Sequence, residues 1–498
     1  LPMGCLTHTP MQKSEEYHSS LDDKERLSFA AMEKCIDAYE NILSSIENNG
    51  LYLNTKPDGE PHLGKYPMEQ VKRVDKPTTR IDTDKVKRVP LRAAFFTRPI
   101  FGDLGAKVKD ERARFINKNP LSEAIGEVMS AMIPLHEGPV AEEEAPFTDD
   151  PELMAKHIKS LAYFLDMDIV GICEVPDYAW YTHDGKGNPV EAKHKYALVC
   201  LIDQGFETME GASGDDWISG TQSYRAYLRG AEVGSVIAGY IRKLGFDARC
   251  HSAPSGQVMQ IPLMLLAGLG ELSRIGELVL NPFIGPRSKT VVITTDLPME
   301  CDKPIDFGLQ KFCDNCFKCA RECPCNAIPF GPKIMYNGYE IWKPDVENCA
   351  KYRITNPKGS ACGRCMKTCP LNKVVTKDGP LMQRIASWLG INAMWLKPLM
   401  IPIAVWLDDA MGNGTRVKGQ KWWLDIESLD GKIIKARGVN ERDIDIKKKW
   451  PKTNKVALYL PEDHPPGDSK EPFPNDRKAA LAKGDEALKP ENSPANAP

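Results

Sequence analysis

The sequence has no uninterrupted apolar run long enough to cross a membrane. Its most apolar stretch is residues 388–407, and Lys397, Pro398 and Pro402 interrupt it. A membrane-spanning helix needs ~20 consecutive apolar residues. The start of the chain also shows neither a basic and apolar leader nor a twin-arginine pair. We therefore expect a cytoplasmic protein without an integral membrane segment, in which this stretch forms buried or surface-docking helices.

The sequence also lacks an excess of charge of either sign. Its 65 basic and 68 acidic residues give a formal net charge of -3. A nucleic-acid partner requires a basic face for its phosphates, so the composition gives no electrostatic case for one. With 498 residues, the chain has room for about three domains at ~150 residues each.

Cysteine, by contrast, is concentrated in two short runs. One is a C-x2-C-x2-C-x3-C-P segment starting at Cys313, and the other is a C-x2-C-x3-C-P segment starting at Cys362, with Cys349 thirteen residues before it. This spacing is typical of bacterial ferredoxins that hold two 4Fe-4S clusters. Disulfide scaffolds are short and secreted, and a zinc site closes with four ligands, so neither alternative predicts two such runs. The other seven cysteines show no ligand spacing, and we expect them to be inert: Cys5, Cys35, Cys173, Cys200, Cys250, Cys301 and Cys325.

The ligands of the two clusters are expected to cross over between the runs. In the bacterial pattern the fourth cysteine of a run ligates the other cluster. We therefore predict one cluster on Cys313, Cys316, Cys319 and Cys369, and the other on Cys349, Cys362, Cys365 and Cys323. Two such clusters indicate electron transfer or redox catalysis.

Helix-like and strand-like patterns alternate in the part of the chain that precedes the cysteines. The alternation favours an α/β domain with a central sheet. We predict helices over residues 22–46, 153–165 and 224–244, and strands over residues 167–173, 196–202 and 289–295.

Five segments follow from these patterns. The tail is rich in Pro, Lys, Glu, Asp and Ala, a composition typical of disorder. The predicted segments are a helical segment and linker (1–88), an α/β domain (89–310), a two-cluster domain (311–380), an extension packing over the core (381–460) and a disordered tail (461–498).

The order of these segments resembles the cobalamin-dependent reductive dehalogenases, in their soluble, non-respiratory branch. The resemblance covers roughly residues 90–430 and rests on residues 267–276, on the Thr-Asp-Leu-Pro segment that ends at Pro298, and on the cysteine runs. It implies an α+β or α/β fold, in which a nitroreductase-like domain holds base-off cobalamin and a ferredoxin-like domain with two 4Fe-4S clusters follows. Glycines allow a flat or phosphate-bearing cofactor to approach the backbone closely. The predicted cofactor contacts are Ser255, Gly256, Gly268, Gly270 and Ser273.

The same resemblance implies four catalytic residues. Tyr227 would be the proton donor, with Ser223 four residues before it, Lys289 about sixty residues after it, and Arg353 over the substrate. A phenol has a pKa near ~10, and a nearby cation makes its proton transferable and stabilises the tyrosinate. Each residue also has an ordinary interpretation: Tyr227 as a packing residue on a helix face shared with Tyr224, and Lys289 as part of a solvated loop.

The expected activity is the replacement of halogen by hydrogen on a small organohalide, for which an acidic halophenol and a neutral halide are equally suitable. Some soluble relatives carry a fused reductase with a C-x4-C-x2-C run, which this chain lacks. Electrons would then come from a separate ferredoxin, flavodoxin or reductase. Two alternatives remain: an epoxyqueuosine reductase that acts on tRNA, and a plain 4Fe-4S electron carrier.

Overall fold

A computed structural model describes residues 64–449, except residues 378, 394, 396 and 422, and residues 455–494. The helix predicted at residues 22–46 lies outside these residues. The chain divides into Leu1–Leu63 and one compact unit, Gly64–Pro498. The boundaries predicted near residues 310, 380 and 460 therefore do not separate compact units. The physical reason is a shared core, in which Tyr66, strand residues of the sheet, Cys313 and Ile391 belong to one apolar cluster.

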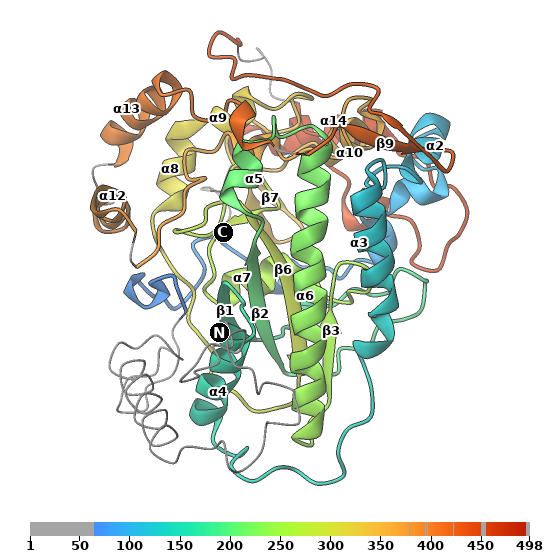
Figure 1. Cartoon of the computed structure of the whole chain (residues 1–498), viewed down its shortest axis with the longest axis vertical. Helices are drawn as coiled ribbons and strands as arrows, with labels where there is room; N and C mark the ends of the chain where they lie inside the picture. Colours follow the sequence, from blue (N-terminus) through green and yellow to red (C-terminus); the bar gives the residue numbers. More distant parts are fainter. Residues whose placement is uncertain are drawn as a thin grey trace, which may run out of the picture. The chain divides into compact units, whose positions relative to one another are not determined.

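The unit is built around a four-stranded antiparallel sheet of order β1-β2-β6-β3 (Figure 1). Three of its strands confirm the predicted ones. Helix α6 covers one face and α7 (Gln260–Leu266) packs against the other, so the strands are buried almost throughout, and β2 appears in the sequence as a nearly continuous apolar run. The strands are β1 Ile169–Glu174, β2 Tyr196–Asp203, β3 Ala248–His251 and β6 Ser288–Thr295.

Helix α6, Trp217–Lys243, is the long helix in front of the sheet in Figure 1. The prediction of a helix at residues 224–244 is confirmed, although the helix begins two turns earlier. Gly230 and Gly234 lie on its sheet-facing side, where an added Cβ would meet Val291 of β6. The two glycines therefore set how closely α6 approaches β6.

Replacing Gly234 by alanine is expected to destabilise the fold by about 1–3 kcal/mol, because overpacking forces the surrounding core to shift. The new Cβ would lie 2.7 Å from the Cys250 Sγ and 2.9 Å from the Val291 Cγ2. Thermal unfolding measures the change. The matched control is Gly239→Ala on the same helix, where the nearest neighbour is the end of the Arg242 side chain at 3.6 Å. Its expected effect is neutral or stabilising, by up to about 1 kcal/mol. Equal unfolding temperatures for the two variants would contradict the close packing.

Two segments that we predicted to be loosely held are packed. Residues 64–88 were assigned to a linker, yet Tyr66, Met68 and Val71 are buried in the main core. The prediction of a disordered tail is wrong for residues 461–494. Helix α14, Arg477–Ala487, buries Ala480, and Arg477 pairs with Asp345 and Glu347. Composition missed this because ion pairs and apolar contacts with distant segments hold an otherwise polar helix.

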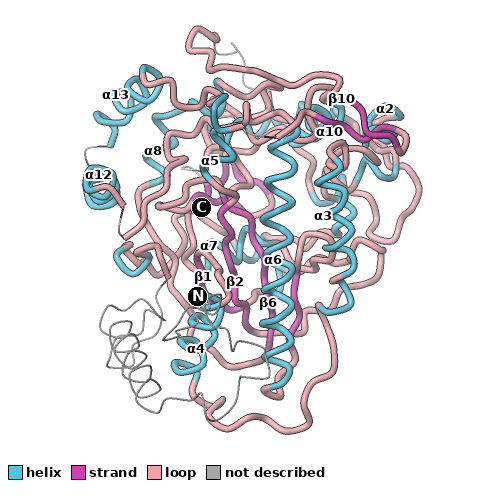
Figure 2. Tube along the Cα trace, viewed as in Figure 1, coloured by secondary structure: helices cyan, strands magenta, loops and turns pink. Residues whose placement is uncertain are grey.

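The remaining elements surround the sheet (Figure 2). The helix predicted at residues 153–165 is confirmed as α4. The nitroreductase-like and ferredoxin-like descriptions of the two halves stay predictions. The other helices of the described part are α2 Ala106–Arg112, α3 Pro120–Ala131, α4 Pro151–Phe164, α5 Phe206–Glu210, α7 Gln260–Leu266, α8 Leu309–Cys316, α9 Lys318–Arg321, α10 Val346–Thr355, α11 Arg364–Lys367, α12 Leu381–Asn392 and α13 Lys397–Ala410, and the other strands are β4 Glu271–Leu272, β5 Val279–Leu280, β7 Ile334–Tyr336, β8 Tyr339–Ile341, β9 Ile426–Leu429 and β10 Lys432–Lys435.

Candidate active site and thiol sites

Tyr227 and Lys289 meet between α6 and the start of β6. The Lys289 ammonium lies over the Tyr227 ring, 5.0 Å from its centroid. Tyr227 lies one turn before Gly230 on the side of α6 that faces the sheet, while Lys289 and Val291 alternate along β6 toward that helix. Both side chains are half-buried, and within residues 64–449 and 455–494, apart from the undescribed positions, the Tyr227 hydroxyl has no hydrogen-bond partner. A phenol beside a cation, with its hydroxyl unengaged, is suited to donate a proton.

Ser223 lies one turn before Tyr227, but its hydroxyl is engaged elsewhere. It is buried and donates to the Gln204 Oε1 at 2.9 Å and to the Ser219 carbonyl. The Gln204 Nε2 in turn donates to the carbonyl of Ser288, the residue before Lys289, at 3.3 Å. Ser223 therefore connects α6 to the start of β6 through Gln204, which the sequence analysis did not identify.

Arg353 lies against two phenylalanine rings. It extends from α10, with its guanidinium carbon 4.4 Å from the centroid of Phe96 and 5.7 Å from that of Phe115. The rings are stacked at 5.8 Å. The Nε of Arg353 is buried without a hydrogen-bond partner among the described residues. An unsatisfied buried donor is costly, so this arginine has capacity for a further acceptor.

The same rings connect Arg353 to the tyrosines of α6. The guanidinium carbon of Arg112 lies 5.6 Å from the Phe115 centroid, and its Nε donates to the Phe96 carbonyl at 3.0 Å. Burial raises the pKa of Tyr224, the Arg112 charge opposes that rise, and the Tyr227 phenol adds to it. Arg112, Tyr224 and Tyr227 are therefore close enough to interact. No spacing in the sequence indicated Phe96, Phe115 or Arg112.

Four cysteines from both runs line one cavity, together with Arg274 and Phe317. Cys313 and Cys316 come from α8, Cys319 from α9 and Cys369 from the turn after α11. These are the four thiols predicted for one crossed cluster. The structure brings them together around one cavity, and four thiols are the ligand set of a 4Fe-4S cluster. Their role as iron ligands stays a prediction.

Burial in this cavity favours neutral thiols when no metal is bound. Desolvation raises the pKa of Cys313 to about 12 and that of Cys316 to about 11. Metal ligation requires thiolates, so iron binding here would release protons. Arg274 lies at the same cavity, where its Nε donates to the Cys313 carbonyl at 2.8 Å and its guanidinium carbon lies 4.3 Å from the Phe317 ring centroid.

The other four predicted ligands form a second thiol site. Burial raises the pKa of Cys365 to about 12, and the neighbouring Cys323 and Cys349 raise it further. Burial also raises the pKa of Cys362, and Cys365 and Cys349 add to that rise. A hydrogen bond from Cys325 and the Arg353 charge hold the pKa of Cys349 below its ordinary value. Arg353 therefore lies between this site and the phenylalanine rings.

Cys325 belongs to the second thiol site, contrary to our expectation of an isolated, inert thiol. Its Sγ lies 3.7 Å from the Cys323 Sγ, and it also contacts Cys349. Spacing rules missed it because Cys325 falls two residues after the last cysteine of the standard run. Among the described residues, no group of Cys, His, Asp and Glu side chains forms a site for a single metal ion.

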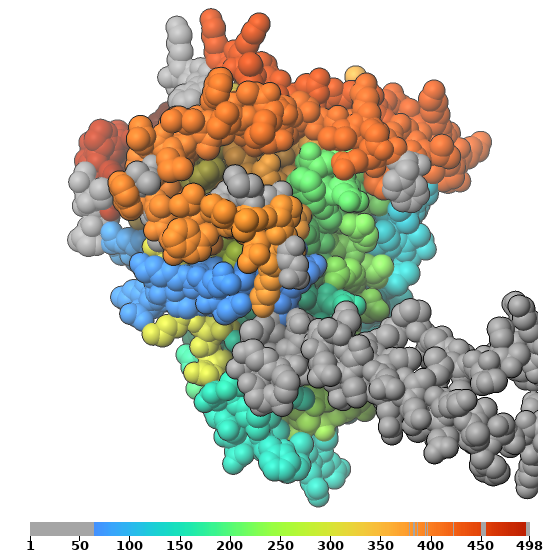
Figure 3. Space-filling model, turned by 60° about the vertical axis from the view of Figure 1, so that its left-hand side comes forward, coloured from blue at the N-terminus to red at the C-terminus, as the bar shows by residue number. Residues whose placement is uncertain are grey.

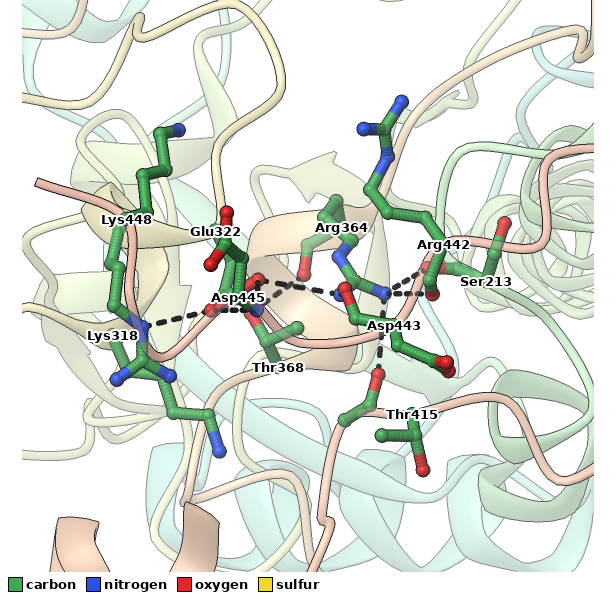
Figure 4. Close-up of polar contacts among 12 residues, drawn as sticks. Ser213, Lys318, Glu322, Arg364, Thr368, Thr415, Arg442, Asp443, Asp445 and Lys448 are labelled. Carbon is green, nitrogen blue, oxygen red and sulfur yellow. Dashed lines mark hydrogen bonds and ion pairs between the residues drawn. The ribbon is translucent and has the colours of Figure 1, made fainter.

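A buried arginine fixes the C-terminal extension over the second thiol site (Figure 4). Arg364, between Cys362 and Cys365, is fully buried and donates to the carbonyls of Ser213 (2.7 Å) and Asp443 (2.6 Å). Glu322 accepts from the Asp445 backbone, and the Lys448 Nζ donates to the Cys323 carbonyl at 2.8 Å (Figure 4). Residues 442–448 thus contact the chain beside these cysteines, and the packing of the whole extension over the core stays a prediction.

The predicted cofactor contacts have other neighbours. A Cβ at Gly268 would meet the Lys303 backbone, and one at Gly270 would meet the Leu280 backbone. At both glycines the protein backbone is therefore closely approached by another segment of the chain. Among the others, the Ser255 Oγ accepts from Arg249 at 3.1 Å, Gly256 is in ordinary contact with the Ser252 carbonyl, and Ser273 lines the first thiol cavity. The surroundings of these five residues do not identify a corrinoid site, and their assignment stays a prediction.

Comparison with curated proteins finds reductive dehalogenases. The tetrachloroethene reductive dehalogenase of Sulfurospirillum multivorans is 34% identical over 203 residues, 39% of this chain and 36% of that protein. That of Dehalobacter restrictus is 33% identical over 226 residues, 40% of this chain and 39% of that protein. An epoxyqueuosine reductase of Shewanella oneidensis is 24% identical over 268 residues, 49% of this chain and 62% of that protein. No protein-family model matches.

Comparison with solved structures gives the same family. The catabolic reductive dehalogenase NpRdhA, in complex with 3-bromo-4-hydroxybenzoic acid, is 47% identical with a TM-score of 0.81, covering 86% of this chain and 62% of the other. A further reductive dehalogenase structure, described as suggesting a mechanism for B12-dependent dehalogenation, is 46% identical with a TM-score of 0.82. The chain spans less than two fifths of the two reductive dehalogenases from curated proteins and less than two thirds of these solved chains. Over most of its own length, this chain is therefore similar in sequence and fold to reductive dehalogenases.

Proposed function

We propose that this protein is a reductive dehalogenase that replaces halogen by hydrogen on a small organohalide. The observation that carries the proposal is the Lys289 ammonium over the Tyr227 ring, in a chain that also brings four predicted cluster thiols around one cavity. The net reaction consumes two electrons and one proton and releases a halide ion. The chain must therefore supply a proton donor and a route for single electrons.

Tyr227 would supply the proton. Its hydroxyl gives up the proton as the new carbon–hydrogen bond forms, and the Lys289 cation then stabilises the tyrosinate. Ser223 and Gln204 would position Tyr227 relative to Lys289, because their hydrogen bonds hold this turn of α6 against the residue before Lys289. Tyr227 and Lys289 are the proposed catalytic pair, and Ser223 is a positioning residue.

Arg353 would hold an anionic group of the substrate near the second thiol site. Its Nε has no partner among the described residues, and its guanidinium lies on the Phe96 and Phe115 rings, which offer apolar contact to an aromatic substrate. The structure of NpRdhA was solved in complex with 3-bromo-4-hydroxybenzoic acid, a bromophenol that carries a carboxyl group. A halophenol that carries an acidic group is the substrate class that these residues suit best.

The two thiol sites would carry electrons toward this region. When bound, two 4Fe-4S clusters supply single-electron transfer, and a corrinoid supplies the strong reductant that carbon–halogen cleavage needs. The second thiol site would be nearer the substrate, because Arg353 acts on Cys349 and also contacts the phenylalanine rings. The first site would accept electrons from a separate ferredoxin, flavodoxin or reductase.

The proposal is tested by metal analysis and halide release. Protein produced with cobalamin should contain about eight irons and one cobalt per chain. With a chemical reductant it should release halide from halophenols, and 3-bromo-4-hydroxybenzoic acid is the first substrate to try. Iron without cobalt, or no halide from any organohalide, would refute it.

Epoxyqueuosine reduction is the second candidate, and it is not favoured. It rests on the 24% identity given above. The net charge of -3 gives no electrostatic support for binding tRNA. A function as a plain electron carrier is less favoured than epoxyqueuosine reduction, because it leaves the Tyr227 and Lys289 pair without a role.

A further inference from the structure

Helices α12 and α13 and the turn between them expose large apolar side chains, which we call the apolar face. We define it by six side chains: Leu381, Trp388, Trp395, Leu399, Ile403 and Trp406. The three tryptophans are 59%, 76% and 66% exposed, and Leu381, Leu399 and Ile403 are 66%, 71% and 56% exposed. Figure 3 brings this orange segment to the front of the domain surface. Proteins rarely expose so many large apolar side chains together unless something binds there.

The charged residues of α12, the turn after it and α13 up to residue 407 are of one sign, and the two acidic residues at the end of α13 are paired with Lys318 and Arg321. Residues 379–407 contain Arg384 and Lys397 but neither aspartate nor glutamate, in a chain where 68 of 498 residues are acidic. Arg384 is exposed, whereas the Lys397 Nζ donates to the Phe307 carbonyl. An apolar face with cations and no acidic residues complements an anionic, partly apolar partner.

The two helices are too short to cross a bilayer. With 12 and 14 residues, they would be roughly 18 and 21 Å long, against the ~30 Å of a hydrocarbon core. No helix of the described part is long and apolar enough to span a membrane. Such helices can lie in the interface, where tryptophan rings are preferred because one end is apolar and the other hydrated.

We propose that α12 and α13 dock this protein on the surface of a bilayer that contains anionic phospholipid. The tryptophans of the apolar face insert at the level of the headgroups, and Arg384 contacts lipid phosphates. Helix α13 is firmly held for this role, because it packs against α8 and its last turn forms ion pairs with Lys318 through Asp408 and Asp409. Docking would hold the first thiol site, on α8, at the membrane side.

Co-sedimentation of the full chain with vesicles of phosphatidylglycerol and phosphatidylcholine tests the proposal. The protein should bind, and its tryptophan emission should shift to shorter wavelength and be quenched by brominated lipid. The variant Trp388→Ser/Trp395→Ser/Trp406→Ser should bind at least about tenfold more weakly. Arg384→Glu should weaken binding to anionic vesicles several-fold and leave binding to pure phosphatidylcholine unchanged.

The matched control removes equally exposed apolar side chains elsewhere. Leu135, Phe147 and Phe164 are 57%, 74% and 65% exposed, and their combined replacement by serine should leave vesicle binding unchanged. Failure of the unmodified protein to bind anionic vesicles overturns the proposal, as does full binding by the tryptophan variant. A dimer in light scattering that the tryptophan variant dissociates, without vesicle binding, would instead make the apolar face an interface between two copies.

Discussion

Replacing Tyr227 by phenylalanine is expected to lower kcat for dehalogenation by ~10²–10⁴-fold, the usual contribution of a positioned proton donor. The ring would keep its place under the Lys289 ammonium and against β6, so only the hydroxyl is lost. Because the reaction needs a proton after the electrons arrive, reduction of the metal centres should proceed as before. Stopped-flow reduction measured beside steady-state halide release separates the two.

The control for this variant is Tyr224→Phe. Tyr224 lies one turn earlier on α6 and is also partly buried, but it interacts with Arg112 instead of Lys289. Its replacement should change kcat by less than ~3-fold, within the range of a conservative change away from a proton donor. Full activity in Tyr227→Phe, or an equal loss in both variants, would remove Tyr227 as the proton donor and leave the family assignment intact.

Replacing Cys369 by alanine is expected to remove the cluster of the first cysteine run, although Cys369 belongs to the second. Cys369 lines the same cavity as Cys313, Cys316 and Cys319. Iron should fall from about eight to about four per chain. The activity should fall with it, because electrons would have to bypass one site. Iron analysis and the electron paramagnetic resonance spectrum of the reduced protein report the loss.

Cys365→Ala is the matched comparison, because Cys365 lies four residues before Cys369 but interacts with Cys323 and Cys349. It should remove the other cluster, so the two variants should leave different residual spectra. Cys313→Ala should reproduce the spectrum of Cys369→Ala. Identical spectra for Cys365→Ala and Cys369→Ala would show that the ligands do not cross, and the arrangement of the thiol sites proposed above would fail.

Short segments of the sequence predicted helices and strands correctly where the pattern of apolar residues was clear. The strand at residues 196–202 is a continuous apolar run because helices cover both faces of the sheet, and residues 289–295 are rich in the β-branched residues that strands favour. The helix at residues 153–165 has an apolar face and an aspartate cap at Asp150. The prediction of a disordered tail failed because the ion pairs of Arg477 join this segment to residues about 130 positions away. Composition cannot report such contacts.

The sequence by itself determined the two cysteine runs, the Tyr227 and Lys289 spacing implied by the family, and hence the expected redox chemistry. Only the tertiary structure decided which residues surround them. It added Cys325 to the second thiol site, Arg274 to the first, and the Phe96 and Phe115 rings to Arg353. It also showed that Gly268 and Gly270 lie close to the backbone of Lys303 and Leu280. Spacing along the chain fixes which side chains share a helix turn or strand face, whereas contacts between distant segments depend on how the whole core packs.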